Sequence, residues 1–171
     1  MTTDSPTPGS SQGTLHLDGD VATMTFVRRL PHPVAEVWAA ITDPDQRAGW
    51  LGPGTVDGRA GGTVETVADG PPVPDEIKRM TGEILVWDPP HVFEHEWHQS
   101  VVEPGVVRYE LAAEGDQTVL TFTHRGLGEK NAEGFIPGTH AYLDRLAAAL
   151  AGTEVPDWGT RYGEVAGFYA T

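Results

Sequence analysis

The residues best able to do chemistry in this chain are three histidines and a tyrosine. His95, Tyr109 and His124 fall at alternating positions of segments with β-like patterning, and His140 falls within a helical pattern. Imidazole titrates near neutral pH, so such side chains in a pocket can move protons or polarise a carbonyl group. The same residues also suit an ordinary core in which each ring bonds to a backbone carbonyl, because a lone histidine is more often structural. The residue types alone are compatible with both interpretations.

Other catalytic arrangements are excluded because the chain lacks the residues that they would need. The chain contains no cysteine, and its single serine after residue 13, Ser100, has no GxSxG context, so neither nucleophile is available. Gly61-Gly62 is not followed by the lysine of a phosphate-binding loop, and residues 126–128 lack the third glycine of a dinucleotide fingerprint. We therefore expect no cofactor.

A metal site is not expected either. His91, His95 and His98 belong to one strand-like segment, in which successive side chains point to opposite faces. His91 and His95 share a face but lie roughly 13 Å apart along a strand, whereas zinc holds each ligand nitrogen at about 2 Å. His98 points to the other face.

The charge of the chain limits its partners. Its 171 residues include 25 acidic and 11 basic ones, for a net charge of −14. This disfavours nucleic acids and anionic membranes, because both attract basic surfaces. Hydrophobic residues make up 39% of the chain, enough for a core, and no segment has the pattern of a membrane span or signal peptide. We therefore expect a single cytoplasmic domain that binds neither nucleic acid nor membrane.

The elements that must position these residues follow from periodicity and turn residues. Residues 1–13 are rich in Ser, Thr, Pro and Gly, which predicts a disordered arm. Residues 15–30 are typical of a hairpin closed at Asp18-Gly19. Helical spacing follows over 34–41, and a second short helix is expected over 44–50, where proline occupies the first position.

Five β-like runs and one long helical pattern complete the domain. The helical pattern covers 131–150 and stops at Gly152, with Pro137 as an alternative first residue. Short links between the runs indicate antiparallel neighbours. The order predicts an α+β fold: a curved antiparallel sheet of about six strands around a long C-terminal helix, with two short helices after the first long strand. The five runs are 63–68, 80–87, 92–98, 106–113 and 119–124.

Four segments carry a resemblance to a known family. They are RLPHP at 29–33 with VWAAITDP at 37–44, DPP at 88–90 before a strand ending in Trp97, LTFTHRGL at 120–127, and HAYLDRLAAALAG at 140–152. In this order they resemble the SRPBCC superfamily, which has the START/Bet v 1-like helix-grip fold. The similarity is greatest to its bacterial branch related to the C-terminal domain of the Hsp90 ATPase activator Aha1. It spans the predicted domain, residues 14–152.

The resemblance implies an elongated cavity between the sheet and the long helix. Strand alternation and one stripe of the helix then select the side chains that face it. An apolar pocket with a few convergent polar groups is typical of a small-molecule site, so we expect a small apolar or aromatic ligand. The expected cavity residues are Trp38, Phe93, His95, Trp97, Val107, Tyr109, Leu111, Leu120, Phe122, His124, Ile136, His140 and Leu143.

The resembled family is functionally mixed, so the fold does not define one function. Its members include ligand carriers, polyketide cyclases, stress proteins and co-chaperones. Ligand binding is the primary hypothesis. The first alternative is a cyclase-, aromatase- or hydrolase-like enzyme with His95, Tyr109 and His124 as catalytic candidates, and the second is an Aha1-like partner of a chaperone. The family usually has tryptophan before the last-helix histidine. This chain has Thr139, which predicts a larger or more polar cavity if that position lines it.

Residues 153–171 form an aromatic extension after the domain. Four residues recur at helical spacing after the start signal Pro156-Asp157, and three glycines form a second row. Glycine destabilises an isolated helix, so this helix must dock, and its glycines would allow close backbone approach. It is expected to clamp its own domain, cover the pocket as a lid, or join two copies as a homodimer. The stripe is Trp158, Tyr162, Val165 and Tyr169, and the glycines are Gly159, Gly163 and Gly167.

Overall fold

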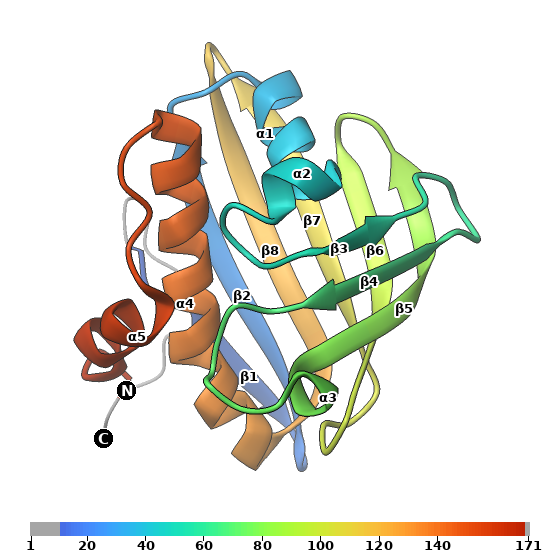
Figure 1. Cartoon of the computed structure of the whole chain (residues 1–171), viewed down its shortest axis with the longest axis vertical. Coiled ribbons are helices and arrows are strands. Elements are labelled where there is room, and N and C mark those ends of the chain that lie inside the picture. The colour runs from blue at the N-terminus through green and yellow to red at the C-terminus, as the bar shows by residue number, and fades with distance from the viewer. Residues whose placement is uncertain (1–10, 170–171) are drawn as a thin grey trace.

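An antiparallel sheet curved around one long helix forms the fold of residues 11–169, the part of the chain described by this computed structural model (Figure 1). The helix-grip architecture is confirmed, but the sheet has eight strands rather than about six. The strands are β1 (Thr14–Asp18), β2 (Val21–Leu30), β3 (Gly54–Val56), β4 (Thr63–Val67), β5 (Arg79–Asp88), β6 (Val92–Gln99), β7 (Gly105–Glu114) and β8 (Gln117–Gly128). They lie in the order β1-β2-β8-β7-β6-β5-β4-β3.

Tight turns explain the antiparallel pairing at two of the hairpins. Gly19 and Gly115 have φ angles of +66° and +62°, which glycine adopts without the strain that other residues would meet. Asp18 pairs with Val21, so the first turn is Gly19-Asp20, one residue later than expected. The sequence does not predict β3, because three residues are too few to show alternation between apolar and polar positions.

Five helices accompany the sheet. The two short helices expected after the first long strand are present, but the second ends at Arg47 and not at residue 50. The Asp43 carboxylate caps it by accepting a hydrogen bond from the Asp45 amide at 3.1 Å. The long helix includes Pro137 in its interior, so the alternative start at that residue is wrong. Gly152 ends this helix as expected, with φ of +71°. The helices are α1 (Val34–Thr42), α2 (Pro44–Arg47), α3 (Asp75–Lys78), α4 (Glu129–Ala151) and α5 (Trp158–Ala166).

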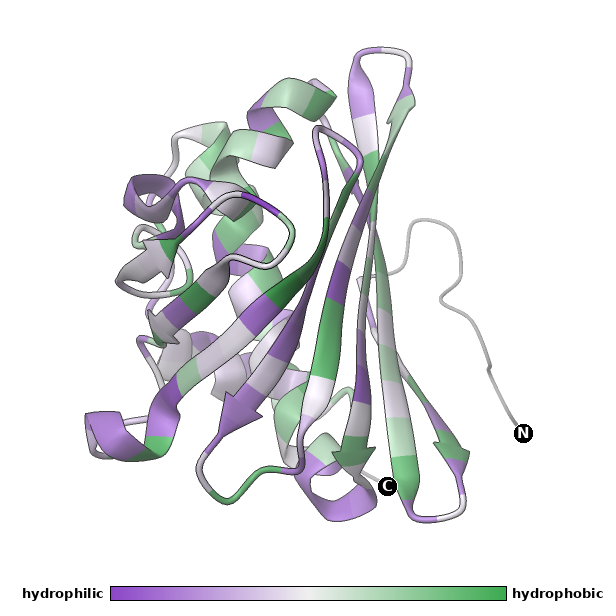
Figure 2. Ribbon diagram, turned by 90° about the vertical axis from the view of Figure 1, so that its right-hand side faces the viewer, coloured by the Kyte–Doolittle hydropathy of each residue, from purple (hydrophilic) through white to green (hydrophobic). Residues whose placement is uncertain are grey.

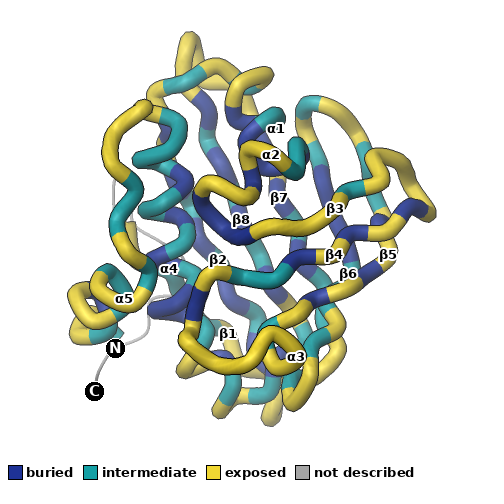
Figure 3. Tube along the Cα trace, viewed as in Figure 1, coloured by how far each residue is buried: buried dark blue, intermediate teal, exposed yellow. Residues whose placement is uncertain are grey.

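Apolar side chains on the concave face of the sheet form the core. Hydrophobic and hydrophilic positions alternate along the long strands (Figure 2), and the inner face of the sheet and of α4 is buried (Figure 3). Trp38 of α1 packs edge-to-face on Trp87 and Phe93, with ring centroids 5.1 and 6.4 Å apart. The Trp50 indole donates to the Ala40 carbonyl at 2.8 Å. These contacts fill the end of the concave face that α1 and α2 cover.

The C-terminal extension docks on its own domain through α5. The Trp158 indole donates to the Gly138 carbonyl at 3.2 Å, and Val165 is fully buried. Arg161 binds the Asp144 carboxylate at 2.7 Å, and Arg28 of β2 binds the other oxygen of that carboxylate at 2.9 Å. Asp144 therefore ties the extension to both α4 and the sheet.

The glycine row of the extension does not provide the expected close approach. A Cβ added at Gly163 or Gly167 would meet no atom within 4 Å, so these positions are open. The close approach is on α4 instead, where a Cβ at Gly138 would lie 3.2 Å from the Trp158 ring. Of the predicted disordered arm, residues 1–10 lie outside the described residues, and the Ser11 carbonyl accepts hydrogen bonds from Arg28 at 2.8 and 3.1 Å.

Three histidines are buried in this fold and are neutral. Burial lowers the pKa of His95 and His124 to about 3 and that of His140 to about 4. His95 Nδ1 lies 2.8 Å from the Glu96 carbonyl, and because a carbonyl only accepts, this nitrogen carries the proton. His140 Nδ1 lies 2.7 Å from the Tyr169 hydroxyl. In the described part of the chain, Nε2 of each ring has no hydrogen-bond partner.

Removal of residues 153–171 tests the docking of the extension. Ending the chain at Gly152 exposes the face of α4 that Trp158 and Val165 cover and leaves Asp144 without Arg161. We expect the free energy of unfolding in urea to fall by about 3 kcal/mol. An unchanged value would contradict the clamp. Light scattering on both chains tests the homodimer alternative, which predicts a dimer only for the full chain.

The three buried histidines predict a loss of stability on mild acidification. In the unfolded chain they bind protons below about pH 6.5, whereas the folded protein binds them only near pH 3 to 4. The unfolded state therefore holds more protons between pH 7 and pH 5, which lowers stability by about 2 kcal/mol per histidine. Urea unfolding at the two pH values measures this. His95→Gln should reduce the pH dependence and the exposed control His98→Gln should not; equal stability at both pH values refutes the prediction.

Candidate functional site

A cavity of about 460 Å³ lies between α4 and the concave face of the sheet. The N-terminal half of α4 forms one wall, and side chains of β6, β7 and β8 form the opposite one. The rest of the lining comes from Trp50 and Leu51 after α2, the segment 68–71, Lys78 of α3, and Trp158 and Tyr162 of α5. The cavity therefore extends from the segment that follows α2 towards the end of the concave face where α3 and the start of α4 lie (Figure 1).

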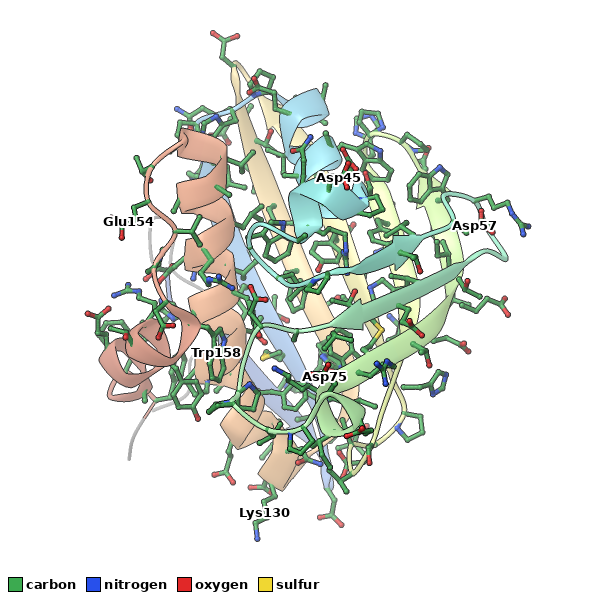
Figure 4. All side chains as sticks on the ribbon, in the orientation of Figure 1. Asp45, Asp57, Asp75, Lys130, Glu154 and Trp158 are labelled. Carbon is green, nitrogen blue, oxygen red and sulfur yellow. The ribbon has the colours of Figure 1, made fainter. Side chains whose placement is uncertain are left out.

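Aromatic rings supply much of the cavity wall. Trp97 of β6 meets Phe135 of α4 edge-to-face with centroids 6.4 Å apart, and the same Phe135 lies 5.7 Å from the His124 ring. On the other side, Trp158 lies between α5 and α4 (Figure 4), with ring centroids 5.6 Å from Tyr142 and 5.0 Å from Tyr162. Such rings present large, stiff apolar surfaces that suit a flat or hydrophobic ligand.

Tyr109 is the polar group that the fold positions most firmly in this wall. It lies on β7, and behind it the guanidinium of Arg47 donates to the Ile41 carbonyl at 2.8 Å and the Thr66 hydroxyl at 3.0 Å. Arg47 is only 2% exposed and forms no ion pair with a carboxylate in the described residues. Burial raises the pKa of Tyr109, while the charge of Arg47 acts in the opposite direction.

This arrangement leaves Tyr109 as a hydrogen-bond donor. The charge of Arg47 acts on its oxygen, and its own proton can be donated to an acceptor in the cavity. A buried cation next to a phenol also polarises the O–H bond, since the field is weakly screened in the interior. The side chain can therefore donate to a carbonyl or other oxygen of a molecule in the cavity.

His124 is the second polar group of the wall. It lies on β8, is 2% exposed, and its Nε2 has no partner among the described residues. Burial keeps its pKa near 3, so the ring is neutral at physiological pH. A neutral imidazole can donate one hydrogen bond and accept another, but it is a weak base here because charging it costs its desolvation.

The structure brings only part of the predicted cavity set to the cavity. Trp97, Tyr109, Phe122, His124 and Leu143 line it. The remaining predicted residues do not line it and pack in the core or beside it, because the α1 end of the concave face is filled. They are Trp38, Phe93, His95, Val107, Leu111, Leu120, Ile136 and His140.

The catalytic candidates divide in the same way. Tyr109 and His124 line the cavity, whereas His95 is fully buried, bonded to the Glu96 carbonyl and absent from the lining. Thr139, where the resembled family usually has tryptophan, does line the cavity. A threonine there leaves room that an indole would occupy.

Sequence reasoning missed the stripe of α4 that faces the cavity. The predicted stripe of Ile136, His140 and Leu143 points mainly into the core, and the neighbouring stripe of Phe135, Thr139 and Tyr142 lines the cavity. Phe135 and Tyr142 are spaced seven apart beside glycines at 134 and 138, and this spacing could have indicated the stripe. Trp50 was missed because it follows a short helix and has no periodic neighbours.

No group of three or more His, Asp or Glu side chains within residues 11–169 is arranged to hold a metal ion. None of the helices in that range is both long enough and apolar enough to span a membrane.

Comparisons with known proteins place the chain in a family. The family profile described as "Activator of Hsp90 ATPase homolog 1-like protein" matches residues 31–151. The solution structure of the protein encoded by gene BPP1335 from Bordetella parapertussis is 30% identical, covers 99% of this chain and 94% of its own, and has a TM-score of 0.69. A search of curated proteins found no match.

Two further solved structures share the fold. CalU16 from Micromonospora echinospora is 24% identical, with 92% of each chain covered and a TM-score of 0.67. Ms6760 from Mycobacterium smegmatis is 23% identical, covers 83% of this chain and 99% of its own, and has a TM-score of 0.63. From the family profile, the Bordetella relative and the shared architecture, we conclude that this chain belongs to the Activator of Hsp90 ATPase homolog 1-like family of the SRPBCC superfamily.

Proposed function

We propose that the protein binds a small hydrophobic or aromatic molecule in the cavity between the sheet and α4. The observation that carries this proposal is a cavity of about 460 Å³ with aromatic walls and few polar groups. Small-molecule sites typically have volumes of about 300–1,000 Å³, apolar walls and a small number of orienting polar groups. Tyr109 and His124 are the orienting groups here.

Thr139→Trp is the sharpest test of this function. The indole would fill space beside Phe135 and Tyr142 that a ligand needs, without removing any buried contact. We expect the affinity for the neutral fluorescent probe N-phenyl-1-naphthylamine, measured by titration, to fall at least about tenfold. The fold should persist, since position 139 is partly exposed on a stable helix.

The matched control is Thr63→Trp. Thr63 lies on an exposed position of β4 and does not line the cavity, so the same substitution adds the same bulk elsewhere. The control should bind the probe like the wild type. If the wild type does not bind the probe, or if Thr139→Trp binds it equally well in a folded protein, the proposal fails.

A cyclase- or aromatase-like enzyme is the second candidate, and the observation that favours it is the buried charge of Arg47 acting on Tyr109. A polarised phenol facing an apolar cavity can stabilise negative charge that develops on a substrate carbonyl oxygen. His124 is the neighbouring candidate for proton transfer, although its depressed pKa makes it a weak base. The chaperone-partner alternative stays a prediction.

Tyr109→Phe tests the role of the phenol in either case. The hydroxyl should donate a hydrogen bond to the carbonyl oxygen of 2-acetylnaphthalene. The hydrocarbon 2-ethylnaphthalene has a similar shape but no hydrogen-bond acceptor. In competition with the fluorescent probe, the affinity of the variant for the ketone should be about threefold to tenfold lower, as expected for one lost hydrogen bond. The hydrocarbon should bind the variant and the wild type alike; an equal loss for both ligands would indicate only a changed cavity shape.

A further inference from the structure

Both lysines of a chain that is otherwise strongly acidic belong to the lining of the cavity. The sequence has two lysines, Lys78 and Lys130, against 25 acidic residues, and both border the cavity. Lys78 is the last residue of α3, and Lys130 is the second residue of α4. In Figure 4 the Lys130 side chain extends from the end of α4 into solvent, while the residue itself belongs to the lining of the cavity.

Neither lysine is neutralised by a carboxylate within residues 11–169. The Lys78 ammonium makes one long contact, 3.4 Å, to the backbone carbonyl of Asp69. Lys130 forms no ion pair there, although Glu133 lies one helical turn away. Both charges are therefore free to meet an anion.

The cavity lining includes no aspartate or glutamate. Two nearby carboxylates are also engaged elsewhere: Asp69 binds Arg145 at 3.0 Å, and Glu103 accepts hydrogen bonds from the Gly128 amide at 2.7 Å and the Asn131 amide at 3.0 Å. Deeper in the wall, the buried charge of Arg47 lies behind Tyr109. The carboxylates next to the lysines in sequence, Asp75, Glu76, Glu129 and Glu133, are exposed and do not line the cavity.

We propose that the ligand is an amphipathic organic anion, with an apolar or aromatic body in the cavity and its acidic group at the rim formed by Lys78 and Lys130. The proposal rests on the ligand-binding function above and adds the charge of the ligand to it. A neutral ligand would leave both ammonium groups unused, and a cation would meet no carboxylate in the lining. The two lysines are 52 residues apart in sequence, so only the fold brings them to one cavity.

The net charge of the protein does not prevent this binding. At physiological ionic strength the Debye length is about 8 Å, so distant surface acids are largely screened at the rim. The charged residues that line the cavity then contribute most to its local potential, and those residues are the two lysines. The same screening makes the effect sensitive to added salt.

A matched pair of fluorescent probes tests the inference. N-phenyl-1-naphthylamine and 1-anilinonaphthalene-8-sulfonate share one aromatic body, and only the second carries a negative charge. In 50 mM salt, the double variant Lys78→Gln with Lys130→Gln should bind the sulfonate with about fivefold lower affinity than the wild type. Its affinity for the neutral amine should stay within about twofold of the wild-type value. In 500 mM salt the wild type should lose most of this preference.

Arg29→Gln with Arg59→Gln is the control for net charge. Both arginines are exposed, neither lines the cavity, and their replacement removes the same two positive charges. This variant should bind both probes like the wild type. Loss of sulfonate binding in Thr139→Trp establishes that the sulfonate occupies the cavity.

The outcomes separate this inference from the function on which it rests. If the wild type binds the neutral amine and the lysine variant keeps the same ratio of the two affinities, the inference is wrong and ligand binding stands. If the arginine control loses the sulfonate equally, the lysines have no special role and the inference is also wrong. If the wild type binds neither probe, both proposals fail.

Discussion

The cavity exists because one helix cannot cover the concave face of an eight-stranded sheet. Eight strands at about 4.8 Å spacing span roughly 38 Å, whereas a helix with its side chains is only about 10 Å wide. At one end, α1 fills the difference with Trp38, which packs on Trp87 and Phe93. At the other end, α4, α5 and the segment 68–71 close over the sheet without filling it. The cavity is thus a consequence of the architecture.

The charged groups in this interior either have ion-pair partners or act on a neighbouring side chain. Asp144 is shared by Arg28 and Arg161, which fixes α5 against α4 and the sheet. Arg47 has backbone and hydroxyl acceptors but no carboxylate, so its charge acts on Tyr109 instead of being cancelled. The surface is strongly acidic while the cavity lining contains no acid. The acidic residues that dominate the net charge are therefore kept out of the cavity lining.

The fold could be predicted from the local sequence pattern, whereas the candidate site could be predicted only in part. Alternation placed Phe93, His95 and Trp97 on one face of β6, and the structure agrees for all three, yet only Trp97 reaches the cavity. Alternation reports the face of a strand and carries no information on which end of that face stays open. The same limit applies to α4, where periodicity identified the core stripe through His140 but not the neighbouring stripe through Thr139.

The sequence by itself determined the class of fold, the order of its main elements, the family, the absence of thiol chemistry, and the inward faces of the long strands. These properties depend on residue type and on spacing within one segment. The tertiary structure decided where the cavity lies, that Tyr109 rests against Arg47, and that Lys78 and Lys130 border one space. Those residues come from segments far apart in the chain, and only the curvature of the sheet around α4 sets the distances between them.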